Sequence, residues 1–382
     1  MVLTGSMARG EGSACMRKEG SVRVYGDIEM LVVFDDTEDM AEHASRLKAL
    51  GNDVTGKLND TGVLCDVEYG PAPRKYFAHI RPHIFGFELK KHAKVLWGDE
   101  SVLDLIPDMK EVDIPVEDAW MLLSNRVVEQ LLCLDGAISG VSVDATVDEA
   151  VLYNHCKMIL DLATSILVFT GMYRASYEER AAMIDRAVRA IGNDETRDAL
   201  AGFPDKVRFW TEAKLDPVLL SEYGTCGPAS GRCSLDLWLE LVPLVRAVWT
   251  WETNLLTGGR WELDPRRLAE RVLSSEGFLR RLKGWARLAL NREVSKTPAF
   301  FRKMTGGIFR GSPRYLVYIS SILLYFSTPG LLNGGGENEK ETLDFIGRNI
   351  PVVFDSGEAS DWQSVRRDLV RGWRVYLRNS GV

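Results

Sequence analysis

The chain has 382 residues, of which 46 % are hydrophobic and 26 % are charged, an ordinary composition for a globular protein. This length exceeds the usual size of one domain, so we expect two. The net charge of −7, from 47 basic and 54 acidic residues, does not favour a protein that wraps nucleic acid through its overall charge.

Cysteine and histidine spacing excludes the usual metal motifs. The six cysteines form no C-x-x-C pair, which predicts reduced thiols, and His79 and His83 have no zinc-ligand context. The start of the chain lacks the basic and apolar regions of a signal peptide. The most apolar stretch, Tyr315 to Phe326, is shorter than the roughly 20 residues that a membrane span needs. We therefore expect a cytoplasmic protein without a membrane span.

The first part of the chain, residues 1–115, is predicted to be a mixed α/β domain. Short β-like runs alternate with a segment of helical apolar spacing that ends at Gly51, a residue typical of helix C-termini. The expected elements are strands at Val2 to Thr4, Ile28 to Phe34 and Gly62 to Tyr69, and a helix from Glu38 to Leu50. Strand, helix and strand in this order indicate a mixed sheet with flanking helices.

Residues 116–382 are predicted to form an all-helical domain, with a subdivision near Gly258. Apolar residues recur there at helical intervals, and no internal repeat is present. The expected helices are Val116 to Leu134, Asp148 to Tyr173, Tyr177 to Ile191, Leu235 to Leu256, Leu263 to Leu290, Ser312 to Phe326 and Asp361 to Leu377. The fold class expected for the whole chain is α+β.

A glycine-rich segment follows the first β-like run. It reads GSMARGEG from Gly5 to Gly12. Glycines let a backbone turn tightly and approach a phosphate group closely, and Ser6 adds a hydroxyl donor. The segment is a candidate phosphate-binding turn.

Two carboxylates open the second strand. Asp27 and Glu29 precede the apolar run MLVVF, and alternation along a strand places both side chains on one face. Carboxylates held side by side repel unless a cation lies between them. Mg²⁺ prefers a few carboxylate oxygens together with phosphate oxygens and water, so this pair is a candidate magnesium site.

A second acidic pair lies on the third strand. Asp66 and Glu68 also share one face of their predicted strand. If this strand lies beside the strand of Asp27, either residue can supply a third carboxylate and complete a two-metal site. The sequence does not decide between Asp66 and Glu68, nor whether the third acid is a ligand or a general base.

Gly-Ser followed by Asp-x-Glu at the head of an apolar strand resembles the signature of the DNA polymerase β-type nucleotidyltransferase superfamily. The resemblance covers roughly residues 1–115, and Lys94 to Asp99 (KVLWGD) resembles a segment that often follows the third strand in these proteins. Twenty residues separate Ser6 from Asp27, about twice the common gap, so we expect residues 14–25 to loop out as a hairpin.

The resemblance implies a nucleoside triphosphate as substrate, with ATP as the default donor, and Mg²⁺ as cofactor. Gly5, Ser6 and Arg9 would lie at the triphosphate, and Asp27, Glu29 and Asp66 or Glu68 would bind the metal ions and act in catalysis. The acceptor would be a hydroxyl compound and the second product pyrophosphate.

The helical part adds one candidate for the nucleotide site. Tyr153, Lys157 and Asp161 follow one another at i,i+4 spacing, hence on one helical face, and Lys157 is placed to meet a phosphate. The alternative, a salt-bridged stripe on a bundle helix, is equally favoured there. For Asn125 and Arg126 the structural alternative is favoured.

A basic run between Arg280 and Arg314 is interleaved with aromatic residues. It has the composition of a polyanion site, although such runs more often form a solvated helix face. It motivates an alternative in which a protein or RNA is the nucleotidylated partner. A second alternative is a nucleotidyltransferase-like fold that has lost catalysis and serves as a binding or scaffold module.

Overall fold

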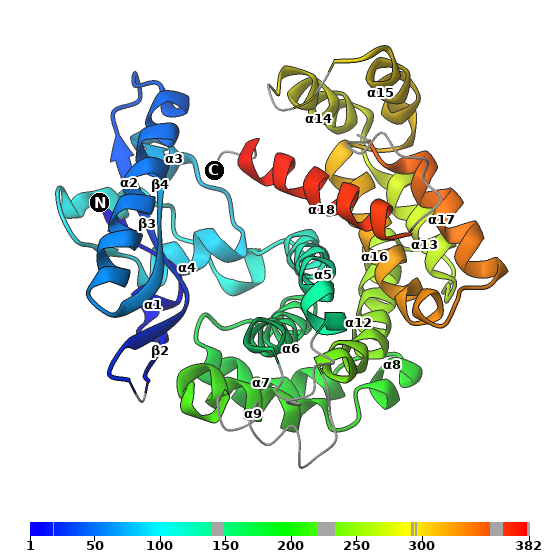
Figure 1. The fold of residues 1–382 in the computed structure, drawn as a ribbon, viewed down its shortest axis with the longest axis horizontal. Coiled ribbons are helices and arrows are strands. Elements are labelled where there is room, and N and C mark those ends of the chain that lie inside the picture. Colours follow the sequence, from blue (N-terminus) through cyan, green and yellow to red (C-terminus); the bar gives the residue numbers. More distant parts are fainter. Residues whose placement is uncertain are drawn as a thin grey trace.

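The computed structural model describes residues 1–17, 19–139, 148–220, 234–291, 294, 296–351 and 362–379. In these ranges every strand lies before residue 96, and the chain from residue 116 onward is helical, which confirms the α+β class. Figure 1 shows the sheet at one side of the molecule, with α5 leading from it into the helices. The boundary predicted at residue 115 stays a prediction, because buried apolar residues of both parts form one continuous cluster.

In the described residues, the N-terminal part combines five strands with one long helix, α2, and several short ones. Its elements are β1 (Val2–Leu3), α1 (Gly5–Arg9), β2 (Ser13–Met16), β3 (Val22–Phe34), α2 (Met40–Asp60), β4 (Val63–Pro73), α3 (Arg74–His79), α4 (Ile84–His92) and β5 (Lys94–Val95), followed by two 3₁₀ turns, Glu100–Leu105 and Glu111–Asp113.

The helical part is larger. Its described helices are α5 (Val116–Ser139), α6 (Glu149–Phe169), α7 (Tyr177–Arg189), α8 (Asp194–Ala199), α9 (Phe203–Leu215), α12 (Ser234–Thr257), α13 (Pro265–Ser275), α14 (Phe278–Leu290), α15 (Pro298–Arg310), α16 (Pro313–Leu332), α17 (Glu337–Asn349) and α18 (Trp362–Asn379).

The sheet is mixed. β3 pairs antiparallel with β2 and β1, β1 pairs antiparallel with β5, and β4 runs parallel to β3. The pairing of β2 with the start of β3 forms the hairpin expected at residues 14–25. One face of the β3–β4 pair packs against α2 through Val67 on β4 and Val54 and Leu58 on the helix. The opposite face carries the acidic residues.

The prediction that α2 ends at Gly51 was wrong. The helix continues to Asp60, and Gly51 lies inside it. A Cβ built on Gly51 would lie 2.6 Å from the backbone oxygen of Val67. This glycine therefore allows α2 to approach β4 closely and does not mark a helix end.

The long helix predicted from Leu263 to Leu290 is two helices. α13 ends where Glu276 adopts an extended backbone, and α14 begins after Gly277. The carboxylate of Glu276 accepts a hydrogen bond from the backbone N–H of Ser312 at 2.6 Å, across to the start of α16. The chain therefore leaves the helix at Glu276, where this buried carboxylate bonds to a distant part of the chain. Helical periodicity in the sequence does not reveal such a contact.

Two of the described helices are long and apolar enough to cross a membrane by length and composition, α6 and α16. α16 is longer than the apolar stretch that ends at Phe326, because it continues through Pro329 to Leu332. Most of each helix is buried inside the protein, as in the core helices of soluble proteins, so the two helices are weak evidence for a membrane span.

Candidate functional site

The four acidic residues predicted from the sequence lie together on neighbouring strands. In the parallel pairing of β3 with β4, Asp27 stands opposite Asp66 and Glu29 stands opposite Glu68. Residues paired in this way project to the same side of a sheet, and neighbouring strands lie about 5 Å apart. We call these four residues the acidic face. The sheet thus places four carboxylates in two facing pairs.

The acidic face reaches the glycine-rich segment through Glu29. Gly5 begins α1 with a φ of +66°, a conformation that favours glycine, and a Cβ built on it would lie 2.6 Å from Glu29 Oε2. The backbone N–H of the preceding residue, Thr4, donates to the carbonyl oxygen of Glu29 at 2.9 Å. The glycine-serine turn and the strand of carboxylates are therefore in direct contact.

Electrostatics within the acidic face follow from this crowding. Burial first, and then the charges of Asp27 and Glu68, raise the pKa of Glu29 from its ordinary 4.5 to about 7. The pKa of Glu68 is also raised, first by partial desolvation and then by Asp27 and Asp66. The positive charge of Lys157 opposes both shifts. An additional cation would remove most of the repulsion.

A cavity of about 480 Å³ opens between this sheet and α6. Acidic groups outnumber basic ones in its lining, where Lys157 and Arg23 are the cations. The lining residues are Arg23, Val24, Tyr25, Gly26, Asp27, Asn52, Thr55, Asp66, Val67, Glu68, Glu149, Ala150, Tyr153, Asn154 and Lys157. We call this cavity the acidic cleft. It joins three of the four predicted carboxylates to the predicted Lys157.

Tyr153 of α6 lines the cleft and packs beside the strand at Gly26. Its hydroxyl would lie 2.9 Å from a Cβ built on Gly26, which has a φ of +95° and directly precedes Asp27. Its ring lies 5.2 Å from Lys157 Nζ and 5.8 Å from the centre of the Tyr25 ring. The i,i+4 spacing of Tyr153 and Lys157 thus brings both residues to one cavity.

The third residue of that stripe has a structural role. Asp161 Oδ2 accepts from Arg126 Nε at 2.6 Å, and Arg126 also pairs with Glu129. The side chain of Asn125 bonds to Glu129 and accepts from Trp373 Nε1 at 2.6 Å. Asn125, Arg126 and Asp161 therefore join helices of the bundle, as the favoured structural interpretation of Asn125 and Arg126 predicts.

Arg9, predicted at the triphosphate, lies in an ion-pair network. Its side chain, only 4 % exposed, bonds to Glu11 Oε2 at 2.9 Å and pairs with Glu88 of α4. Glu88 in turn pairs with Arg180 and accepts from the hydroxyl of Tyr173. Arg9 thus joins α1 to α4 and to the helical part, and a phosphate would have to compete with two carboxylates for it.

Two basic residues at or near the cleft had no signal in the sequence. Arg23 lines the cleft, and its Nε has no hydrogen-bond partner among the described residues. Lys214, which is 3 % exposed, donates to Ser13 Oγ at 2.6 Å and to the Tyr153 hydroxyl at 3.5 Å. Burial lowers the pKa of Lys214 to about 8. Ser13 lies 201 positions away in the chain, so only the fold reveals this contact.

The side chains of the acidic face are not arranged as a preformed metal centre. In the part of the chain that the structure describes, no three Asp, Glu, His or Cys side chains are close enough together to hold a metal ion. The sheet register nevertheless brings the four carboxylates within reach of one another by side-chain rotation.

Comparisons with protein-family models, with curated proteins and with solved structures gave no match.

Proposed function

We propose that this protein is a Mg²⁺-dependent nucleotidyltransferase. It would transfer a nucleotidyl group from a nucleoside triphosphate, with ATP as the default donor, to a hydroxyl acceptor with release of pyrophosphate, in the cytoplasm. The observation that carries the proposal is the acidic face: its Glu29 contacts the glycine-serine turn at Gly5, and its other three carboxylates line a cleft with Lys157.

The donor set fits a hard divalent cation. The acidic face offers only carboxylate oxygens, which Mg²⁺ prefers, and the pKa of Glu29 is raised first by burial and then by the neighbouring charges of Asp27 and Glu68. Asp27, Glu29 and Asp66 would hold the metal, and Glu68 is the other candidate for the third carboxylate, since Asp66 stands opposite Asp27 and Glu68 opposite Glu29. When bound, Mg²⁺ would neutralise phosphate oxygens and lower the pKa of the attacking hydroxyl.

The other residues of the site would bind and orient the nucleotide. Lys157 lines the cleft, its charge acts on both Glu29 and Glu68, and it would meet a phosphate oxygen. Gly5 and Ser6 would lie at the triphosphate, where backbone N–H groups and the Ser6 hydroxyl would donate to phosphate oxygens. Tyr153 is a positioning residue, because its contact with Gly26 fixes the strand at Asp27.

The experiment is a pyrophosphate-release assay on the full chain, with each of the four nucleoside triphosphates and a panel of hydroxyl acceptors. We expect release with Mg²⁺ and none in EDTA. The same samples are titrated with a non-hydrolysable ATP analogue, and its affinity should rise when Mg²⁺ is added. A nucleotide affinity that is the same with and without Mg²⁺, or no nucleotide binding at all, would contradict the proposal.

The second candidate is a nucleotidyltransferase-like binding or scaffold module without catalysis. It is favoured by the absence, within the described ranges, of three metal-ligating side chains placed together. Measurable turnover in the assay above would exclude it. If the acceptor is an RNA, binding of that RNA should weaken steeply with salt.

A further inference from the structure

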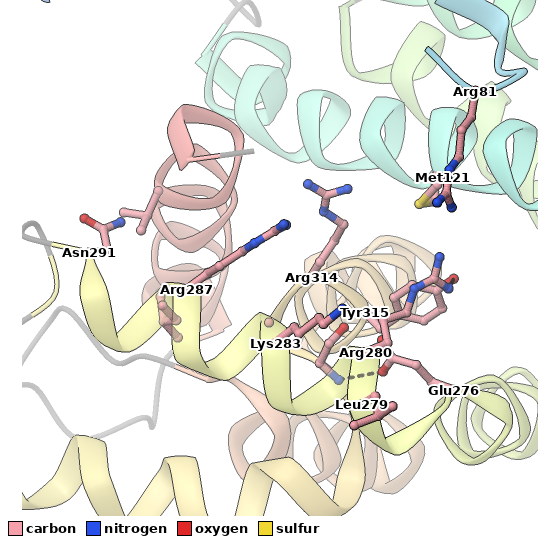
Figure 2. Close-up of a pocket in the computed structure, with 14 residues that line it drawn as sticks. Arg81, Met121, Glu276, Leu279, Arg280, Lys283, Arg287, Asn291, Arg314 and Tyr315 are labelled. Atoms are coloured by element: carbon pink, nitrogen blue, oxygen red, sulfur yellow. Dashed lines mark hydrogen bonds between the residues drawn. The ribbon is translucent and has the colours of Figure 1, made fainter. Parts of the chain in front are cut away.

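A second cavity, of about 520 Å³, lies among the C-terminal helices. Its lining comes from α14 and Glu276 before it, the start of α16, Met121 of α5, Val375 of α18, and Arg81 from the segment between α3 and α4. Figure 2 shows side chains from these elements extending into one space, with Arg287 of α14 and Arg314 of α16 both turned towards it. No residue lines both this cavity and the acidic cleft.

The charge of this cavity is opposite to that of the cleft. Five lining residues are basic, and one, Glu276, is acidic. We call it the basic cavity; its basic residues are Arg81, Arg280, Lys283, Arg287 and Arg314. Arg280 is neutralised by an ion pair with Glu117.

Among the described residues, no carboxylate forms an ion pair with the other four cations, which are Arg81, Lys283, Arg287 and Arg314. The net charge of the protein is −7, so this local excess of positive charge is opposite in sign to the charge of the whole chain. Like charges gathered in a concave site repel one another unless an anion neutralises them.

The cations are held there by close packing of α14 against α16. A Cβ built on Gly284 would lie 3.0 Å from both Pro313 Cδ and Ser312 Cβ, so this glycine allows the close approach. The buried Trp285 donates from Nε1 to the carbonyl oxygen of Gly311 at 2.9 Å. Lys283 and Arg287, at i,i+4 spacing, share one face of α14. The cavity is therefore formed by specific tertiary contacts.

The start of α16 adds polar donors to the same space. Arg314 and Tyr315 belong to its first turn, where backbone N–H groups lack partners within a helix. Ser312 precedes the helix, yet its hydroxyl does not cap it. The positive end of this 20-residue helix thus lines the same cavity as the four cations, and the carboxylate of Glu276, which accepts from the N–H of Ser312, is the one acidic group of the described lining beside it.

We propose that the basic cavity binds a compact ligand with two or more phosphate groups, at a site separate from the acidic cleft. The volume lies in the range of small-molecule sites. Sites for single-stranded nucleic acid also need aromatic surfaces on which bases stack. The aromatic residue in this lining, Tyr315, is 5 % exposed, and its ring is stacked on Trp120. The lining therefore favours a small phosphorylated ligand over RNA.

The test is calorimetric titration of the full chain with inorganic tripolyphosphate, in EDTA and at low ionic strength. We expect one site per chain. Arg287→Gln and Arg314→Gln should each weaken binding about tenfold, because each removes one charge-assisted contact. Arg302→Gln, on the exposed surface of α15 and outside the cavity, is the matched control and should bind as the wild type does.

The Asp27→Asn variant distinguishes a failure of this inference from a failure of the proposed function, because Asp27 lines only the acidic cleft. It should lower the rate of nucleotidyl transfer by about 10³-fold and leave tripolyphosphate binding unchanged, since Asp27 does not line the basic cavity. The inference is overturned if tripolyphosphate does not bind, or if Arg302→Gln weakens binding as much as Arg287→Gln does. It is equally overturned if single-stranded RNA, or vesicles of anionic lipid, bind the cavity residues more tightly than tripolyphosphate does.

Discussion

The acidic face and the basic cavity differ from the buried ion-pair networks of the molecule. In those networks opposite charges pair, as in the pairing of Arg9 with Glu11 and Glu88 and that of Arg126 with Asp161. At the acidic face carboxylates stand opposite carboxylates, and in the basic cavity cations face cations. Like charges opposite one another destabilise a fold, so each cluster indicates a ligand of the opposite charge.

The two regions also differ in how their charges are placed. The acidic face is set by strand alternation and pairing in one small sheet, whereas the basic cavity needs α14, α16 and Arg81 to meet. Alternation along a strand therefore predicts much of the acidic face, whereas nothing local predicts the basic cavity. Substitutions in and around the acidic face would sharpen or break this contrast, and their expected effects range from a large loss of activity to a small change in stability.

Asp27→Asn should lower the rate of Mg²⁺-dependent nucleotidyl transfer by about 10³-fold, because a bound metal supplies several kcal/mol of transition-state stabilisation. Pyrophosphate release under saturating nucleotide measures it. Asp198→Asn, an exposed acid on α8, is the matched control and should leave the rate unchanged. Equal rates for the wild type and Asp27→Asn would exclude the acidic face as the metal site.

Glu29→Gln should stabilise the metal-free protein at pH 8. The pKa of Glu29 is about 7 in the fold and near 4.5 when unfolded, so unfolding releases protons between these values. The free energy of unfolding of the wild type therefore falls as pH rises from 4.5 to 7. Urea denaturation in EDTA should show Glu29→Gln to be more stable by about 1 to 3 kcal/mol at pH 8 and nearly equal at pH 4.

The control for this comparison is Glu212→Gln, an exposed residue of α9, whose effect should not vary with pH. A Glu29→Gln protein less stable than the wild type at pH 8 would mean that the carboxylate is not repelled there.

Lys157→Gln should raise the KM for the nucleotide about tenfold and change kcat less, if Lys157 binds a phosphate in the ground state. Initial rates over a range of nucleotide concentrations measure both constants. The control is Lys340→Gln, which removes the same charge from an exposed position on α17 and should leave both constants unchanged. A selective loss of kcat would assign Lys157 to the transition state instead.

Gly51→Ala should destabilise the protein by about 1 kcal/mol or more, because its Cβ would press on the backbone of Val67, between Asp66 and Glu68. Gly56→Ala, in the same helix but with open space around its Cβ, should stabilise it by about 0.5 to 1 kcal/mol. Thermal unfolding of the two variants gives the contrast. Two variants of equal stability would show that α2 does not press on β4.

Much of the acidic face could be predicted from the sequence because its geometry is local. Alternation along a strand places Asp27 with Glu29 and Asp66 with Glu68. The parallel register that sets Asp27 opposite Asp66 depends on how α2 crosses between the strands, and no short motif encodes it. The same limit explains the error at Gly51, whose neighbour is the backbone of β4.

Long-range partners explain the other differences. Arg9 lies in a glycine-rich segment and was predicted at a phosphate, yet Glu88 binds it from 79 positions away. Lys214 has no motif around it and reaches the cleft only because α9 packs beside Ser13 and Tyr153. The basic run was visible in the sequence, but the cavity that gathers part of it required the close packing at Gly284.

The most direct test of the central claim is Mn²⁺ binding to the metal-free protein, followed by the loss of the free-ion signal in electron paramagnetic resonance. The account predicts saturable binding that the double variant Asp27→Asn/Asp66→Asn abolishes and Asp198→Asn does not. Undiminished Mn²⁺ binding by the double variant, or no binding by the wild type, would contradict it.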